Sequence, residues 1–131
     1  MSEQPDLDAE SLDAMDQRRK ALLDESARRL ALGDPRGALR AQQQAVDVLA
    51  AMSARARWYR RILALETLNL AMVSERAGRL GAALRHARQA RALFTVVSQE
   101  DDSRFGPEIA LAQKELRRLW RVRLFLQPRR R

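Results

Sequence analysis

Two glycines, Gly33 and Gly78, limit what this chain can fold into more than any other feature. Each follows a run of helix-forming residues, a place where glycine commonly ends a helix. After each glycine, an Ala-Leu pair follows five residues later and a further alanine twelve residues later. These residues are Ala38, Leu39 and Ala45 in one copy and Ala83, Leu84 and Ala90 in the other. The matched spacing predicts two similar helical hairpins whose glycines lie 45 residues apart.

The composition agrees with an all-α domain. The chain has 131 residues, of which 46% are apolar. This is long enough for one domain with a single core and too short for two domains. Aromatic residues are only 5%, with five glycines and four prolines, so Leu, Ala, Val and Met must build the interior. Such a composition is typical of packed helices.

The apolar spacing predicts five helices. They span about 11–32, from Pro35 to a poorly marked end, about 57–77, about 80–97, and from Gly106 to about residue 125. The third carries two apolar stripes, and a helix that is apolar on two faces is usually packed between neighbours. One stripe is Trp58, Ile62, Leu65 and Met72; the other is Tyr59, Leu63, Leu70, Val73 and Ala77. Because no proline or glycine separates the second and third helices, a single continuous helix is the alternative.

The matched hairpins resemble the tetratricopeptide repeat (TPR) family over about residues 17–97. That family has a glycine in the turn of each hairpin and small residues where the two helices cross, as at Ala38, Ala45, Ala83 and Ala90. The resemblance implies a right-handed, TPR-like helical-hairpin repeat over residues 11–126, with about two hairpins and a C-terminal capping helix. The family period is roughly 34 residues, so the spacing here implies a long-repeat variant. If the capping helix covers the stack incompletely, a homodimer is the alternative.

The resemblance also implies a binding groove, because members of the family hold partners on the first helix of each hairpin. The corresponding residues are Lys20, Asp24, Ala27 and Ala31 in the first hairpin and Leu65, Asn69, Met72 and Arg76 in the second. Lys20 and Asn69 stand where some members clamp the terminal carboxylate of a peptide. Asp24 stands at the other asparagine position of that clamp and would repel a carboxylate. A groove of mixed polarity is therefore expected rather than a clamp.

Charge is unevenly distributed along the chain. The net charge is +8, but the first 16 residues hold six acids and no base, so the remainder carries +14. A basic body of this kind attracts acidic proteins or nucleic acid. Two arginine-rich segments are candidates for a basic patch: Arg57, Trp58, Arg60 and Arg61, then Arg117, Arg118, Arg121 and Arg123. The alternative is that these arginines are solvated while the tryptophan anchors a helix.

Chemistry-bearing residues are scarce. The chain has no cysteine, no glycine-rich phosphate loop and no metal-ligand spacing. Its one histidine, His86, is expected at the surface rather than as a general base. We therefore expect no catalytic residue, metal or cofactor. Residues 1–10 form a predicted acidic, disordered N-terminus and residues 127–131 a basic tail.

These expectations combine into a function. No secretory signal or apolar stretch of roughly 20 residues is present, which favours a cytoplasmic protein without a transmembrane segment. The leading hypothesis is a non-catalytic adaptor or scaffold that binds a peptide or helix of another, acidic protein in its groove. The alternative is a nucleic-acid-binding or regulatory protein that uses the Arg-rich surface and the C-terminal helix. A structural subunit of a larger assembly is the third.

Overall fold

A computed structural model describes residues 10–100 and 106–126, and within them every regular element is an α-helix. The helices are α1 (Leu12–Ala31), α2 (Pro35–Arg55), α3 (Tyr59–Arg76), α4 (Leu80–Glu100) and α5 (Gly106–Leu126). The all-α prediction is confirmed. The chain breaks between α2 and α3 at residues 56–58, so these are two helices rather than one. Most of the predicted acidic segment 1–10 and the whole tail 127–131 lie outside the described residues.

The two glycine turns have the same geometry. Gly33 and Gly78 have φ angles of 76° and 77°, in the left-handed region that glycine enters without steric cost. In each turn, the residue after the glycine donates its N–H to the carbonyl five residues earlier at 2.8 Å: Asp34 to Arg29, and Arg79 to Ser74. The 45-residue repeat seen in the sequence therefore extends to the backbone hydrogen bonds.

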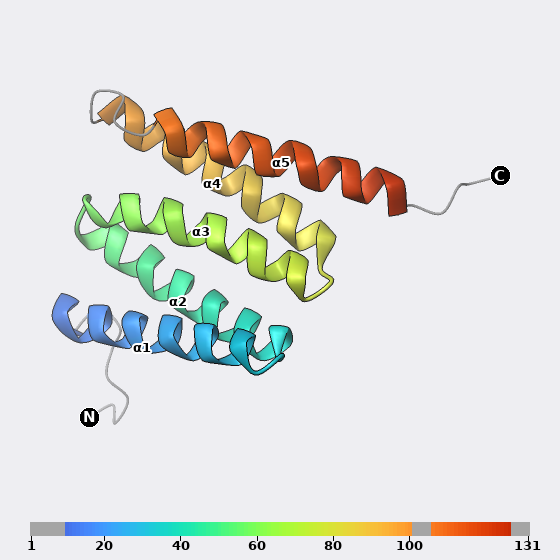
Figure 1. Cartoon of the computed structure of the whole chain (residues 1–131). Coiled ribbons are helices and arrows are strands. Elements are labelled where there is room, and N and C mark those ends of the chain that lie inside the picture. The colour runs from blue at the N-terminus through green and yellow to red at the C-terminus, as the bar shows by residue number, and fades with distance from the viewer. Residues whose placement is uncertain (1–9, 101–105, 127–131) are drawn as a thin grey trace.

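The five helices form two layers (Figure 1). α1, α3 and α5 run in similar directions in one layer, and α2 and α4 run back behind them. The pairs α1–α2 and α3–α4 are helical hairpins. α2 also packs on α3, and α4 on α5, so each helix packs closely on its sequence neighbours. Among the described residues, no helix is long and apolar enough to cross a lipid bilayer.

The alanines repeated in α2 and α4 are part of the buried core. Ala38, Ala45, Ala83 and Ala90 are completely buried. A side chain of one methyl group lets two helix axes come close enough for backbone and neighbouring side chains to interlock. Around these contacts, larger side chains fill the space in three clusters that include Leu49, Leu84 and Phe94.

α3 is the middle helix, as predicted, but only one of its two apolar stripes is covered. Leu63, Leu70 and Val73 of the second stripe are buried. The first stripe is open, because Trp58 is 58% exposed and Leu65 and Met72 are 46% and 45% exposed. The expectation that both stripes are buried was wrong. Towards α4 and α5, α3 instead packs Ala64, Leu68 and Ala71, which lie on a third face of the helix.

The positive φ at the repeat glycine predicts opposite effects for two glycine-to-alanine changes. Gly78→Ala should lower the free energy of unfolding by about 1–2 kcal/mol, since its φ of 77° is costly for any residue with a Cβ. Gly81→Ala, inside α4 with nothing within 4 Å of the added methyl, should raise it by up to about 1 kcal/mol. Urea denaturation of both variants measures the difference. Equal effects would contradict the assigned turn.

Candidate functional site

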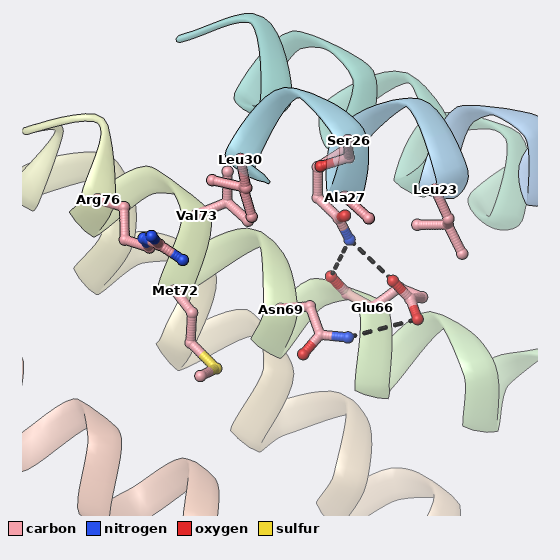
Figure 2. Close-up of a pocket in the computed structure, with 10 residues that line it drawn as sticks. Leu23, Ser26, Ala27, Leu30, Glu66, Asn69, Met72, Val73 and Arg76 are labelled. Atoms are coloured by element: carbon pink, nitrogen blue, oxygen red, sulfur yellow. Dashed lines mark hydrogen bonds between the residues drawn. The ribbon is translucent and has the colours of Figure 1, made fainter. Parts of the chain in front are cut away.

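An open groove lies between α1 and α3 (Figure 2). Its volume is about 350 Å³, within the range of ligand-binding clefts. One wall is formed by α1 through Leu23, Ala27 and Leu30, and the other by α3 through Met72 and Val73. The walls are therefore apolar, and Met72 leaves nearly half of its surface in contact with water.

The floor of the groove is polar and is assembled by three side chains. Gln42 of α2 donates its Nε2 to the backbone oxygen of Glu66 at 3.2 Å and to the Glu66 Oε2 at 2.8 Å. Asn69 donates its Nδ2 to the Glu66 Oε1 at 3.4 Å (Figure 2). Gln42 and Glu66 are both buried, so their hydrogen bonds tie the back layer to α3 beneath the groove. Buried polar groups need such partners to avoid a desolvation cost.

A second buried hydrogen bond fixes the other wall. The hydroxyl of Ser26 in α1 donates to the backbone oxygen of Ala38 in α2 at 2.9 Å. Ser26 is buried and lines the groove beside Ala27. Each wall is thus attached to α2 by a side-chain hydrogen bond, which sets the separation of α1 and α3.

Only some of the residues that the sequence predicted for the groove line it. Ala27, Asn69, Met72 and Arg76 line the groove, whereas Lys20, Asp24, Ala31 and Leu65 do not. Lys20 instead pairs with Asp16, with its Nζ 3.2 Å from the Asp16 Oδ2. On α1 the lining follows Leu23, Ala27 and Leu30, and these leucines could have been found by following the apolar positions of the helix. Gln42 and Glu66 carry no such signal, because their roles depend on contact between two helices.

The groove presents hydrogen-bond acceptors at its floor and a donor towards one end. Both amide hydrogens of Gln42 are used by Glu66, which leaves the Gln42 carbonyl and the Glu66 carboxylate as acceptors. Arg76 lies ten residues after Glu66 along α3, which is about 15 Å at a rise of about 1.5 Å per residue. Among the described residues, no carboxylate pairs with the Arg76 guanidinium. A ligand filling the groove would meet acceptors at the floor and a positive charge near Arg76.

The two arginine-rich segments do not form one patch. Arg57, Trp58, Arg60 and Arg61 are at the start of α3, whereas Arg117, Arg118 and Arg121 lie beside its other end. The length of α3 puts roughly 25 Å between them. Trp58 stacks on Tyr59 with ring centroids 4.3 Å apart. The side chain of Arg123 lies outside the described part of the structure.

Arg118 is part of an ion pair between helices. Its two terminal nitrogens each lie 2.6 Å from a carboxylate oxygen of Glu75 on α3, and Glu115 also pairs with it at 2.7 Å. These hydrogen bonds, to Glu75 first and Glu115 second, raise the pKa of Arg118 above its ordinary value. A bidentate contact of this kind joins α5 to α3, and it occupies the donors that a phosphate would need.

His86 is buried rather than at the surface as the sequence predicted, with 8% of its area exposed. Its Nδ1 donates to the Oε1 of Gln89 at 3.1 Å. Burial, and to a smaller extent the charge of Arg85, lower the pKa of His86 below its ordinary value of 6.5. In the described residues, no three His, Asp or Glu side chains cluster so that they could hold a metal ion.

No family model, curated protein or solved structure matches this chain. The groove and the surrounding charges are therefore the observations from which a function has to be inferred.

The buried amide under the groove predicts a specific pattern of stability. Gln42→Leu should lower the free energy of unfolding by about 1.5–3 kcal/mol, because it leaves the Glu66 carboxylate buried without its closest donor. The double variant Gln42→Leu with Glu66→Leu should be more stable than Gln42→Leu alone, since the buried charge is removed as well. Chemical denaturation at pH 7 compares the three proteins. A double variant less stable than the single one would contradict this contact.

His86 predicts a loss of stability on mild acidification. Its pKa is lowered in the folded protein, so below about pH 6.5 the unfolded chain binds the proton more readily than the folded one. Stability should be fully present above that pH and should fall as the pH is lowered below it towards the pKa of the folded protein. The carboxyl groups of Asp16, Glu25 and Asp34, whose pKa values are also lowered, titrate below this window. Urea midpoints across the window for the native chain and for His86→Gln measure the effect, and an equal slope in both would exclude His86 as its source.

Proposed function

We propose that this chain is a non-catalytic, TPR-like adaptor whose α1–α3 groove binds an amphipathic helix or short extended segment of another protein. The observation that carries the proposal is the open apolar wall above a polar floor. Solvent-exposed apolar side chains that gather beside a concave site are typical of a protein interface. Leu65 and Met72 lie on one side of α3, and Trp58, the residue before the helix, stands a further seven residues back.

The charges in the groove favour a particular occupant. Arg76 supplies a positive charge that pairs with no carboxylate among the described residues, so the bound segment should bring one there. The basic body, +14 outside the first 16 residues, speeds the approach of an acidic partner. Near Glu66 the same segment should present N–H or O–H groups, because a carboxylate at the floor would be repelled. The proposed occupant is therefore acidic at one end and apolar along the face that meets α3.

The repeat geometry supports the TPR-like assignment within this proposal. The two glycine turns share their backbone hydrogen bonds, and the groove lies in the layer formed by the first helix of each hairpin. In the TPR family that layer carries the ligand. We place the adaptor in the cytoplasm, a proposal supported by a chain that has no cysteine to oxidise.

Selection from a displayed library of random helical peptides tests the proposed groove. We expect peptides with apolar residues at helical spacing and a carboxylate at one end to bind. Met72→Glu should abolish their binding, because it places a charge on the apolar wall. Arg76→Gln should weaken acidic peptides by about tenfold and leave peptides without the carboxylate unchanged. Affinities are measured by fluorescence anisotropy.

Val96→Glu is the matched control. Val96 is exposed to the same degree as Met72, 44% against 45%, but it lies on α4 in the other layer. It should leave peptide binding unchanged. Selected peptides that bind Met72→Glu as tightly as the native chain would contradict the groove as the site. Recovery of nucleic acid alone from cell extract, lost on nuclease treatment and on adding salt, would favour the nucleic-acid alternative.

A further inference from the structure

A second hollow lies between α2 and α4, and it is strongly basic. Its volume is about 430 Å³. Three arginines line it from three places in the chain: Arg40 on α2, Arg79 in the glycine turn and Arg85 on α4. No acidic residue is among its lining residues, and the remaining polar ones are Gln43, Gln44, Ser74 and His86. Other arginines of the described structure, such as Arg19, Arg29 and Arg118, have carboxylate partners.

Among the residues that the structure describes, the arginines of this hollow have no such ion-pair partners. Within the described residues, no carboxylate and no hydrogen-bond acceptor pairs with the guanidinium of Arg79 or Arg85. Arg40 is near enough to Asp34 to contribute to the lowered pKa of that carboxyl, but it forms no ion pair in the described structure. Three cations around one concave surface repel one another unless an anion lies between them.

The buried polar groups of the hollow also lack a complete set of contacts. Ser74 is 0% exposed, and its hydroxyl oxygen has no hydrogen-bond partner in the described structure. A buried hydroxyl without a partner costs free energy and commonly marks a missing ligand or water. His86, also buried, is held on its Nδ1 side by Gln89. The hollow therefore combines three cations with buried polar groups.

The helix that follows Gly78 begins differently from the helix that follows Gly33. One residue after Gly33, the Asp34 carboxylate accepts a hydrogen bond from the Gly37 N–H at 2.9 Å and caps α2. One residue after Gly78, the corresponding residue is Arg79, whose side chain has no acceptor to offer the N–H groups at the start of α4. Where the first repeat has its own anion, the second has a cation, and the start of a helix favours negative charge.

We propose that the hollow between α2 and α4 binds a small phosphate-bearing anion, which contacts Arg40, Arg79 and Arg85. Phosphate oxygens accept the forked hydrogen bonds that guanidinium groups donate, and several of them can serve three arginines at once. The volume exceeds what a single ion requires and fits a small phosphorylated molecule. This site is in the layer opposite the α1–α3 groove, so it is independent of the peptide-binding proposal.

The single histidine provides a direct readout. Because His86 is the only histidine in the chain and lines the hollow, its imidazole NMR signals report on this site alone. Titration with inorganic pyrophosphate should shift these signals saturably and raise the pKa of His86, since a nearby anion stabilises the protonated imidazole against burial and the charge of Arg85. Sodium chloride at the same ionic strength should give no saturable shift.

Matched variants separate the site from general attraction to a basic protein. Arg79→Gln with Arg85→Gln should weaken pyrophosphate binding by at least about tenfold, the loss expected when hydrogen bonds to a charged group are removed. Arg91→Gln, on the exposed surface of α4 outside the hollow, removes a charge without touching the site and should leave the affinity unchanged. Tighter binding of ADP than of pyrophosphate would identify a phosphorylated organic ligand. Equal binding of the two would show that the site recognises the phosphate groups alone. A native chain without a saturable shift, or equal losses in the Arg91 variant and the double variant, would overturn the proposal.

Discussion

Close contact between helices through alanine is the interaction on which the rest of this structure depends. Ala38, Ala45, Ala83 and Ala90 are all fully buried, and each contributes only a methyl group to the packing of its helix. Overpacking such a contact forces side chains and backbone apart. The alanines thereby fix the distance between the two layers, and the glycine turns fix where each hairpin reverses. The longer side chains of the core fill the space that these two constraints leave.

The same constraint explains why a groove remains open. α1 and α3 are each held tightly against α2, but no comparable row of small residues draws them against each other. Each is instead tied to α2 by a buried hydrogen bond, Ser26 of α1 to Ala38 and Glu66 of α3 to Gln42. Hydrogen bonds of this kind set a distance without filling the volume. The apolar stripe of α3 that faces this side therefore stays exposed, while its other stripe is buried.

The sequence was informative wherever structure depends on local chemistry. Glycine stops, the Asp34–Pro35 start of α2 and helical spacing located every helix boundary except the end of α2 to within about three residues, since these signals act over one turn. It was less informative where two helices must meet. The pairing of Arg118 with Glu75 and the groove floor around Glu66 each join residues that are distant in sequence. The burial of His86 depends on how α4 is rotated about its axis, which the sequence does not state. The sequence pattern of a stripe such as Trp58, Leu65 and Met72 is the same whether another helix packs on it or it is exposed to water.

The order of contacts along the chain has a consequence for how it folds. All of the closely packed helix pairs are consecutive in sequence, so few long loops must close before native contacts form. Chains built in this way fold fast and open first at their ends, where a helix has a neighbour on only one side. α1 is such an end, and it is also one wall of the groove. Occupancy of the groove would bridge α1 and α3 directly, so a bound segment would suppress fraying of the first helix and slow its amide exchange.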